Sequence, residues 1–269
     1  MPLVLRQWWL PASVMVVCLG IWFAGQAGLL DYRSSRDVLI APGSAHWLGT
    51  NELGQDVLTG LILATPTTLV LAVATAMATS TVAIGAASLV VFSGQFLSGM
   101  VLRIVDAVQV VPTMLVLLLF AALLNPGFLS LFLLLVITGW SDDVRVAAAV
   151  LRRERQRENI QYARAMGAGW LYCWRWHLFA ALRPLCGVLM VQNIRQAALK
   201  SSGLAFLGLT DPRLLTWGSM MQSAMDQLYS GAWVWLLLPP AALLSLLLHV
   251  TLTMGDRSLR SAAVPEFSL

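Results

Sequence analysis

Long apolar runs separated by short polar segments dominate this sequence. A helix that crosses a bilayer needs about 20 apolar residues, and six stretches meet that need once the breaks at Ser93-Gly94-Gln95 and Asn125-Pro126-Gly127 are placed. They lie at about 8–30, 57–92, from Leu97 onward, 128–150, from Pro184 onward, and 232–254. The pattern predicts an all-α membrane protein with about six transmembrane helices.

The composition agrees with this pattern. Hydrophobic residues make up 58% of the 269 residues and charged residues 11%, and the mean hydropathy is +0.77, whereas soluble domains carry roughly 25% charged residues. The net charge of +4 comes largely from arginines gathered between 145 and 183, as in loops that face the cytoplasm. The basic character therefore indicates topology and gives no reason to expect a nucleic-acid partner.

The same charge distribution predicts the domain organisation. With the arginine-rich loop 151–183 in the cytoplasm, both termini lie there too, and 31–60 and 207–230 lie outside. We expect an N-terminal anchor helix at 1–30, too long for a cleaved signal peptide, and an external loop at 31–60. A core of five spans follows at 61–256, and a cytoplasmic tail at 257–269.

The residues give no sign of catalysis. The only lysine, Lys200, lies outside any phosphate-binding glycine motif, and the nucleophile elbow and zinc-protease motifs are both missing. The three cysteines and three histidines lack metal-ligand spacing. We expect no enzyme activity, cofactor or metal site in this chain, so nucleotide binding for any ATP-driven process would belong to another subunit.

Several short motifs occur in a characteristic order. They are His46-Trp47-Leu48-Gly49-Thr50-Asn51-Glu52-Leu53-Gly54-Gln55-Asp56, Trp140 with Arg145, the loop 158–169 followed by His177-Leu178, Gly203-Leu204-Ala205-Phe206-Leu207-Gly208-Leu209, and Trp217-Gly218-Ser219-Met220. Together they resemble the second (C-type) permease of binding-protein-dependent ABC importers of the dipeptide, oligopeptide and nickel family. Gln55 replaces the usual arginine, and Asp142 and Asp143 replace residues that are commonly aromatic or small.

The resemblance implies a fold, a location and partners. It implies a type I ABC importer permease fold with a cytoplasmic coupling helix, placed in a bacterial inner membrane. The implied partners are a homologous second permease, an extracytoplasmic substrate-binding protein and two ATPase subunits, which would hold ATP and Mg. The chain itself would be a non-catalytic permease core at 61–256.

The arginine-rich loop fits the coupling role on physical grounds as well. Its small residues leave a thin backbone that a partner can approach, and its arginines offer charge-assisted hydrogen bonds to acidic groups. We expect a helix at 154–166 ended by Gly167 and Gly169, and coupling to partner ATPases through 154–183. The alternative is a solvated loop that only obeys the positive-inside rule. The expected ATPase-coupling residues are Glu158, Gln161, Ala163, Arg164, Ala165, Gly167 and Ala168.

The fifth span carries a polar stripe. At about 100° per residue, its polar side chains share one side of the helix, and ionisable residues in a span usually face a bundle interior or an aqueous cavity. Our hypothesis is that Arg195 and Lys200 attract a carboxylate-bearing substrate; alternatively they pair with a partner permease or reach the membrane interface. The expected substrate-pathway residues are Gln192, Asn193, Arg195, Gln196, Lys200 and Met221.

Two further local predictions follow. In the third span, Arg103 and Asp106 are three residues apart and can pair with each other. In the external loop, Gly49, Gly54 and Asp56 are the expected residues on the side of the binding protein, although they can equally form a fixed turn that leads into the second span.

The function that these observations favour is import driven by partner ATPases, with the path open alternately to each side. The cargo is nickel or another metal chelate, held by a metallophore, or a peptide; the short external loop leans towards the metal-chelate branch. The alternatives are a self-contained, ion-driven transporter that uses Arg103, Asp106 and the fifth-span stripe, and an adaptor in a membrane complex.

Overall fold

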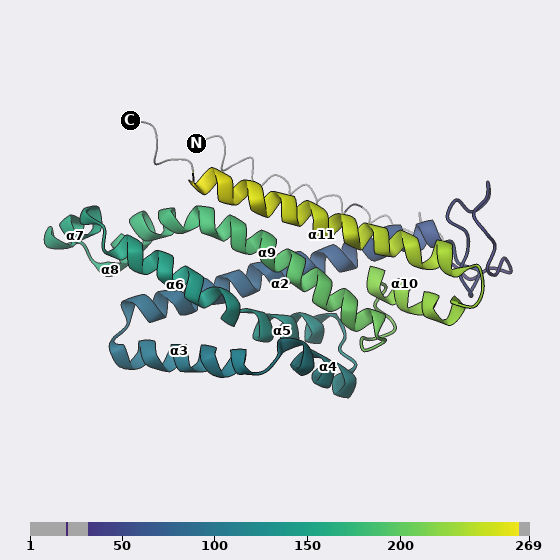
Figure 1. The fold of residues 1–269 in the computed structure, drawn as a ribbon, viewed down its shortest axis with the longest axis horizontal. Helices are drawn as coiled ribbons and strands as arrows, with labels where there is room; N and C mark the ends of the chain where they lie inside the picture. Colours follow the sequence, from purple (N-terminus) through teal and green to yellow (C-terminus); the bar gives the residue numbers. More distant parts are fainter. Residues whose placement is uncertain (1–19, 21–31, 264–269) are drawn as a thin grey trace.

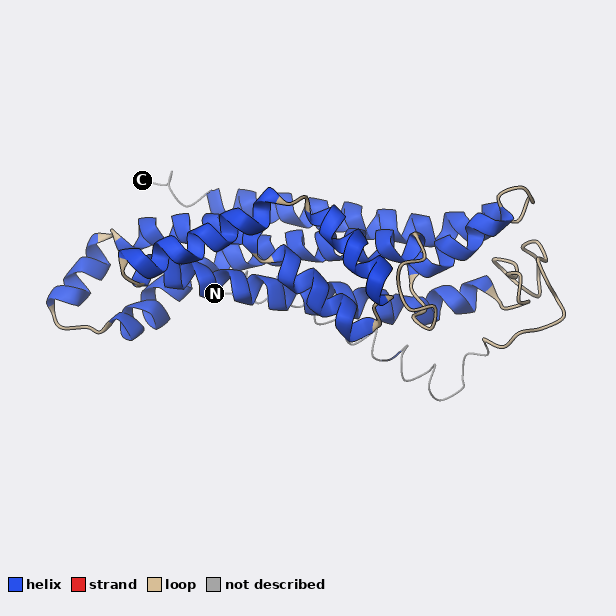
Figure 2. Cartoon of the chain, turned by 90° about the horizontal axis from the view of Figure 1, so that it is seen from below, coloured by secondary structure: helices blue, strands red, loops and turns tan. Residues whose placement is uncertain are grey.

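The computed structural model describes Gly20 and residues 32–263. The expected anchor at 8–30, apart from Gly20, and the end of the tail from 264 lie outside the described residues. Within the described part the chain is helical, and its only strand-like feature is an isolated bridge between Thr50 and Asp56. Figure 2 shows helices joined by short loops, with one longer loop near the start of the described chain.

The longest helix is α2, which runs from Val57 to Phe92 without interruption. It begins at Asp56, whose carboxylate accepts a hydrogen bond of 2.8 Å from the Thr59 backbone N–H. Such N-caps satisfy one of the donors left free in the first turn. The prediction of a single long helix at 57–92 is confirmed, and Pro66 lies inside it.

The third span is broken, which the sequence analysis did not predict. Helix α3 (Gln95–Val110) and helix α4 (Thr113–Leu124) meet at an angle of 74°. Pro112 explains the break, because proline lacks an N–H group and pushes the preceding residue away from helical angles. Val111 accordingly has φ −88° and ψ 127°. The predicted turn after this span is confirmed, since Asn125 takes a left-handed conformation with φ 42°.

The fourth span also consists of two helices, α5 (Phe128–Gly139) and α6 (Ser141–Arg155), joined at Trp140. The fifth was expected to begin at Pro184, which is wrong. Helix α8 (Trp170–Cys173), a π-helical turn (Trp174–Leu178) and α9 (Phe179–Phe206) follow one another directly, with Pro184 inside α9. The helical segment extends towards its N-terminus because Leu178 and Leu182 are fully buried there against other helices.

The last elements are α10 (Trp217–Ala224), a 3₁₀ turn (Met225–Gln227) and α11 (Trp233–Ala263). By length and composition, two helices of the described part suffice to cross a membrane, Val57–Phe92 and Trp233–Gly255, and the bent pair α3–α4 makes a third. Helix α9 has 28 residues, which is about 42 Å of helix, but it carries charged side chains. The division into five core spans stays a prediction.

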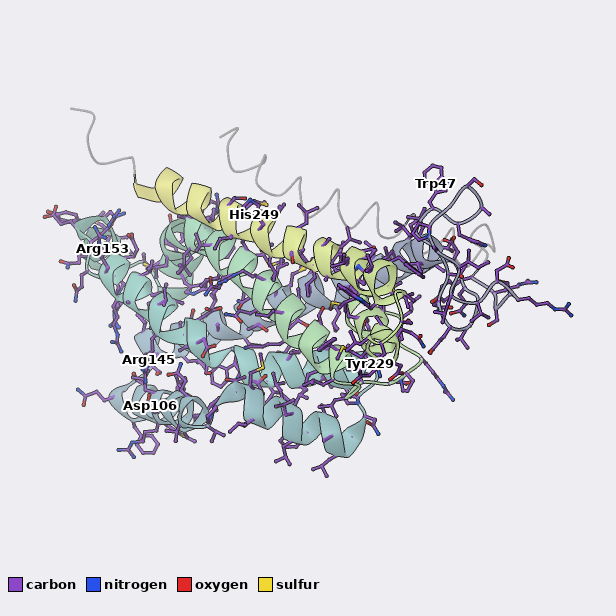
Figure 3. All side chains as sticks on the ribbon, turned by 45° about the vertical axis from the view of Figure 1, so that its right-hand side comes forward. Trp47, Asp106, Arg145, Arg153, Tyr229 and His249 are labelled. Atoms are coloured by element: carbon purple, nitrogen blue, oxygen red, sulfur yellow. The ribbon has the colours of Figure 1, made fainter. Side chains whose placement is uncertain are left out.

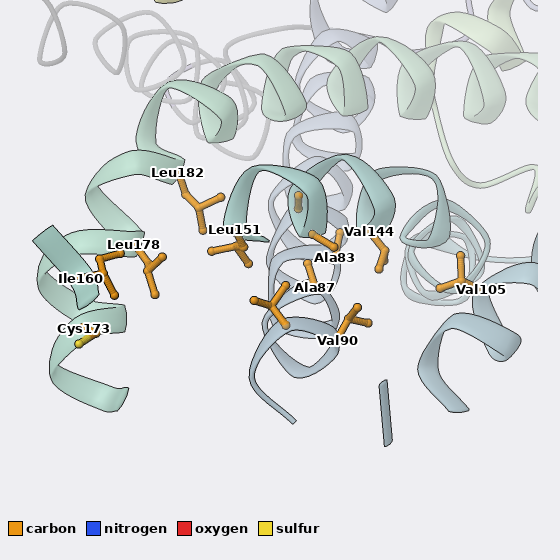
Figure 4. Close-up of a cluster of buried hydrophobic side chains, with 13 residues drawn as sticks. Ala83, Ala87, Val90, Val105, Val144, Leu151, Ile160, Cys173, Leu178 and Leu182 are labelled. Carbon is orange, nitrogen blue, oxygen red and sulfur yellow. The ribbon is translucent and has the colours of Figure 1, made fainter. Parts of the chain in front are cut away.

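The helices form an elongated bundle (Figure 1) in which α2, α9 and α11 run along most of its length. The short helix α7 (Glu158–Ala165) lies at one end of the bundle, and α10 lies at the other together with the loop 32–56. We refer to these as the α7 end and the α10 end. The largest buried apolar cluster lies towards the α7 end, where α2, α3, α6, α7, α8 and α9 all contribute to it (Figure 4).

At the α10 end, close packing depends on Gly218. A Cβ atom on Gly218 would lie 2.5 Å from the Ser202 carbonyl oxygen and 2.7 Å from the Ala205 Cβ atom, both on α9. The neighbouring Trp217 donates its backbone N–H to the Thr68 hydroxyl at 3.2 Å and its indole N–H to the Thr65 hydroxyl at 3.2 Å. The Trp-Gly motif therefore ties α10 to both α9 and α2.

Candidate functional site

The expected coupling segment forms a separate short helix at the α7 end. The sequence analysis predicted one helix over 154–166, which is wrong, because α6 ends at Arg155 and α7 begins at Glu158. The break occurs at Arg157, whose ψ of 143° is extended. Glu158 then opens α7 and Arg164 lies in its last turn, so both charges oppose the partial charges of the helix ends.

Gly167 ends α7 with a Schellman motif. The Ala168 N–H donates to the Ala163 carbonyl at 3.0 Å, and the Gly167 N–H donates to the Arg164 carbonyl at 3.0 Å. Gly167 has φ +90°, a left-handed angle that glycine adopts with the least strain. The predicted stop at Gly167 is confirmed, whereas Gly169 does not have a left-handed φ.

One side chain anchors α7 to the bundle. Ile160 is 1% exposed and belongs to the large apolar cluster at this end. Ala163 and Ala168 are half-buried against the same cluster. The remaining expected coupling residues are exposed: Glu158, Gln161, Arg164, Ala165 and Gly167. Helix α7 thus presents polar and small side chains together with Tyr162 to the outside, Met166 at its C-cap is also exposed, and Ile160 holds the helix from behind.

Some of the nearby arginines have partners within the chain. Arg157 pairs with Glu154 at 3.1 Å, and the Arg155 guanidinium donates to the Val91 carbonyl and lies over the Phe92 ring. The Arg155 contacts join the end of α6 to the end of α2. The arginines of this end therefore also serve the fold, and Figure 3 shows Arg153 at the same end of the molecule.

A buried polar cluster joins α2, α6 and α9 in the interior of the bundle. The Asn193 side-chain N–H₂ group donates to the Asp143 carboxylate at 2.6 Å and to the Ser80 hydroxyl at 3.0 Å. All three side chains are buried. We call Ser80, Asp143 and Asn193 the polar seam. Because a buried carboxylate needs hydrogen bonds or an opposite charge, the seam couples these three helices strongly.

A second polar link lies on the opposite side of α6. Arg145 forms an ion pair with Asp106 of α3, as Figure 3 shows, so the predicted local pairing of Arg103 with Asp106 is wrong. Arg145 reaches Asp106 from another helix because the bend at Pro112 places α3 beside α6. The Gln109 side chain donates to the Ser141 carbonyl at 3.1 Å, beside the α5–α6 break. Helix α6 is therefore held by polar contacts on two sides.

The structure divides the expected substrate-pathway residues. Asn193 faces inward and belongs to the polar seam. Gln192 is exposed and accepts a hydrogen bond of 3.0 Å from Arg195, while Gln196 and Lys200 are half-buried. Met221 lies on α10 and is 8% exposed, which favours packing in the interior for this residue. The stripe on α9 is thus part structural seam and part accessible surface.

The loop at the α10 end is a fixed, hydrogen-bonded turn. Gly49 and Gly54 have φ of +73° and +70°, and a Cβ atom on them would lie 2.6 Å from the Ile40 carbonyl oxygen and 2.3 Å from the Ser35 carbonyl oxygen, respectively. The Trp235 indole N–H of α11 donates to the Thr50 carbonyl at 3.3 Å. Gln55, at the position of the usual arginine, accepts a hydrogen bond of 2.9 Å from the Asn51 side chain.

Asp56 connects this loop to α2. Its carboxylate contacts the His46 Nδ1 atom at 2.9 Å in addition to the Thr59 N–H. Burial raises the pKa of Asp56, but the hydrogen bonds from Thr59 and His46 outweigh burial, so that the net pKa lies below its ordinary value. The described contacts of Gly49, Gly54 and Asp56 are structural, and a role in docking a binding protein stays a prediction.

Sequence reasoning missed the polar seam, because its members are far apart in the sequence. Asn193 was identified, but as a pathway residue, and Asp143 was noted only as a departure from a family pattern. One signal was available. A carboxylate placed inside an apolar span requires a polar partner on a neighbouring helix, and the amide of Asn193 was one of few candidates.

Comparison with known proteins identifies the family of this chain. The family described as "Binding-protein-dependent transport system inner membrane component" matches residues 79–261, more than half of the chain. The chain belongs to this family. It is an ABC importer permease of the dipeptide, oligopeptide and nickel type, and the resemblance stated from the motifs is confirmed.

Relatives with described roles cover most of the chain. It is 30% identical over 243 residues to the di/tripeptide transport system permease protein DppC of Pseudomonas aeruginosa (strain UCBPP-PA14), an alignment that covers 86% of this chain and 78% of that protein. It is 28% identical over 229 residues to the nickel transport system permease protein NikC of Escherichia coli (strain K12), covering 83% and 76% of the two chains.

Solved structures confirm the fold. The chain matches an inward-facing conformation of the MetNI methionine ABC transporter with a TM-score of 0.59 and 18% identity, covering 77% of this chain and 97% of that one. The described residues therefore adopt the type I ABC importer permease fold, as expected.

Membership has direct consequences. As a permease subunit the chain is non-catalytic, and ATP hydrolysis belongs to separate ATPase subunits. It is a multi-pass protein of the inner membrane. The alternatives of a self-contained ion-driven transporter and of an adaptor are thereby dropped.

Proposed function

We propose that this permease couples ATP hydrolysis in partner subunits to import through α7. The observation that carries the proposal is the surface of α7, which is exposed over Glu158, Gln161, Arg164 and Ala165 and is anchored by Ile160. A short helix that is anchored by one buried side chain and exposes its other side can enter a cleft of a partner subunit without losing its own packing. Ala163 and Ala168 pack against the apolar cluster behind it, and Gly167 ends it.

The connections of α7 suggest how movement reaches the bundle. On one side α7 follows α6, and on the other it leads through α8 into α9. These two helices meet again at the polar seam, where Asn193 of α9 binds Asp143 of α6. A displacement of α7 would therefore act on both helices, and the seam would keep them moving together.

The proposed assembly builds on family membership. Membership implies importer partners; we propose one homologous permease, two ATPase subunits that hold ATP and Mg, and an extracytoplasmic binding protein that docks on the loop at the α10 end, around Gly49, Gly54 and Asp56. The α7 end and both termini then lie in the cytoplasm. No cofactor or metal is proposed for this chain itself.

The proposed cargo carries carboxylate groups. The accessible part of the α9 stripe comprises Gln192, Arg195, Gln196 and Lys200, and a cationic side chain inside a membrane domain suits an anionic group. A short peptide and nickel held by an anionic chelator both fit, and the two relatives are permeases of a di/tripeptide and a nickel transport system. We propose these two cargo classes; Met221, which is buried, is not expected to contact either.

Co-purification tests the coupling surface. The chain is extracted in mild detergent from its native host, and Ala165→Glu is compared with Tyr229→Glu, a control that adds the same charge at the exposed α10 end. We expect ATPase subunits and a second permease with the unmodified chain and with Tyr229→Glu. Ala165→Glu should keep the second permease and lose the ATPases. Equal recovery of ATPases with both variants would contradict the proposal.

Uptake assays test the cargo. Cells that lack this permease and are complemented with the unmodified chain or Arg195→Gln are given a labelled dipeptide, or labelled nickel with excess histidine as the chelator. We expect uptake of one of the two cargoes to require this chain. Arg195→Gln should reduce that uptake several-fold while the transporter complex still assembles normally. Unchanged uptake by Arg195→Gln would remove this residue from the pathway while leaving the coupling proposal intact.

A further inference from the structure

A small cavity lies inside the bundle towards the α10 end. Its volume is about 10 Å³, which is close to the smallest space that holds one water molecule. Its walls come from α2, α5, the last turns of α9 and the connection from α9 to α10. All of its lining residues except Leu214 are buried, so the cavity belongs to the interior of the molecule.

Hydroxyl groups provide the polar part of the lining. Five of the nine lining residues carry one: Thr68, Ser201, Ser202, Thr210 and Thr216. None of the nine is charged. Hard cations such as calcium take several oxygen ligands with carboxylates among them, and empty cavities in proteins are apolar. The chemistry of the lining therefore suits a neutral polar molecule of the size of water.

One of these hydroxyls needs a partner. Ser202 is 2% exposed, and its hydroxyl makes no hydrogen bond to any described residue. A serine within a helix can turn its hydroxyl to the carbonyl four residues earlier, which for Ser202 belongs to Ala198. That carbonyl already accepts from the Ser201 hydroxyl at 3.3 Å and, as part of α9, from the Ser202 backbone N–H. Both of its lone pairs are in use, so the Ser202 hydroxyl requires another acceptor.

Two neighbouring hydroxyls can still accept hydrogen bonds. The Thr68 hydroxyl donates to the Ala64 carbonyl at 3.0 Å and accepts from the Trp217 backbone N–H at 3.2 Å, which leaves one lone pair. The Ser201 hydroxyl spends its only proton on Ala198, and its oxygen keeps its capacity to accept. The cavity thus brings together one free donor and two acceptors.

We propose that the cavity binds one structural water molecule, which accepts from the Ser202 hydroxyl and donates to the hydroxyls of Thr68 and Ser201. Three hydrogen bonds are the usual number for a buried water. This water would link α9 to α2 at the same Thr68 hydroxyl that accepts from Trp217. It would therefore be part of the joint that holds α10 against both helices.

X-ray radiolysis tests the site in the full chain, purified with its partner subunits in detergent. A short X-ray pulse makes hydroxyl radicals from bound water, these radicals oxidise the side chains around it, and mass spectrometry locates the oxidised residues. Leu71 and Leu131 line the cavity and are each 1% exposed. Leu117 is the matched control, because it is 0% exposed in the same apolar cluster and does not line the cavity.

We expect Leu71 and Leu131 to be oxidised several-fold faster than Leu117. Ser202→Val removes the hydroxyl and fills the space, so both rates should fall to that of Leu117. Thr251→Val, which removes a buried hydroxyl on α11, should leave them unchanged. If Ser202→Val prevents assembly, Ser202→Cys replaces it, because a thiol is a weak donor and adds less volume.

Two results would overturn the proposal in this comparison: equal oxidation of the three leucines in the unmodified chain, or unchanged oxidation of Leu71 and Leu131 in the Ser202 variant that assembles. A second radical source separates bound water from solvent. Radicals generated from peroxide in the buffer should not oxidise Leu71 or Leu131. Oxidation of both from the buffer would show that the cavity opens to solvent, and this would also overturn an enclosed water site.

Discussion

At the scale of single residues, backbone geometry and capping decide the two ends of this permease. Gly167 ends α7 with a left-handed angle, and Asp56 starts α2 while holding His46. Gly167 was identified from the sequence as a helix stop, whereas Asp56 was singled out only for the side of the binding protein or a fixed turn, and its capping role comes from the structure. The structure adds what each one contacts.

Gly167→Ala should loosen the end of α7. A left-handed angle strains an L-residue by about 1 kcal/mol, so the Schellman hydrogen bonds should open more often. We expect faster hydrogen exchange at the Gly167 and Ala168 amides and weaker recovery of ATPase subunits. Gly169→Ala is the control, because its φ is not left-handed and a Cβ atom there meets nothing within 4 Å. Equal exchange in both variants would contradict this account of α7.

Asp56 gives the loop a defined pH response. Its pKa is lower in the folded chain than the ordinary value of 3.8, so its stabilising effect is present above that value and is lost as pH falls through the folded pKa. In thermal unfolding in detergent, the unmodified chain should have a higher unfolding midpoint than Asp56→Asn at about pH 5, where an ordinary aspartate is ionised. This difference between the two midpoints should vanish once the pH lies below the pKa of Asp56 in the folded chain. A difference that grows as the pH falls from about 5 would contradict a lowered pKa of Asp56 in the folded chain.

At the scale of helices, close approach and buried hydrogen bonds hold α2, α6, α9 and α10 together. Gly218 lets α10 contact the α9 backbone, and Asn193 links three helices through one amide group. The two breaks, at Pro112 and at Trp140, lie near the polar links of Arg145 and Gln109. These contacts fix the helices relative to one another where no regular hydrogen-bond ladder can.

Gly218→Ala should separate α10 from α9. The new Cβ atom would lie 2.5 Å from the Ser202 carbonyl oxygen, and overpacking of this kind destabilises by about 1–3 kcal/mol. Gly85→Ala is the control, since Gly85 is exposed on α2 with open space around it. Thermal unfolding in detergent should show a lower midpoint for Gly218→Ala only. A similar drop in the unfolding midpoint for Gly85→Ala would show that the effect is not specific to the packing at Gly218.

Asn193→Ala should weaken the polar seam. The change leaves the Asp143 carboxylate without its 2.6 Å hydrogen bond, and an unsatisfied buried polar group costs about 1–3 kcal/mol. Gln192→Ala, at an exposed neighbour, should have little effect. Asp143→Ala should then cost much less in the Asn193→Ala background than alone. Additive effects of the two substitutions on the unfolding free energy would show that the side chains are not coupled.

At the scale of the whole molecule, the order of short motifs identified the family, and the apolar runs gave the long helices. Helix α2 matched its predicted bounds because an uncharged run with a capping residue has few alternatives. The starts of α7 and α9 were misplaced, since they depend on whether Ile160, Leu178 and Leu182 find a buried cluster. The seam and the Asp106–Arg145 pair could not be predicted, because pairing across helices depends on packing that one sequence does not reveal.

The central claim is that this chain imports its cargo with energy from partner ATPases. The most direct test is uptake by the purified complex in liposomes, with binding protein and labelled dipeptide or chelated nickel outside and ATP inside. The account predicts uptake that requires enclosed ATP and Mg, survives a protonophore, and falls with Ala165→Glu. Uptake that continues without ATP and stops with the protonophore would contradict it.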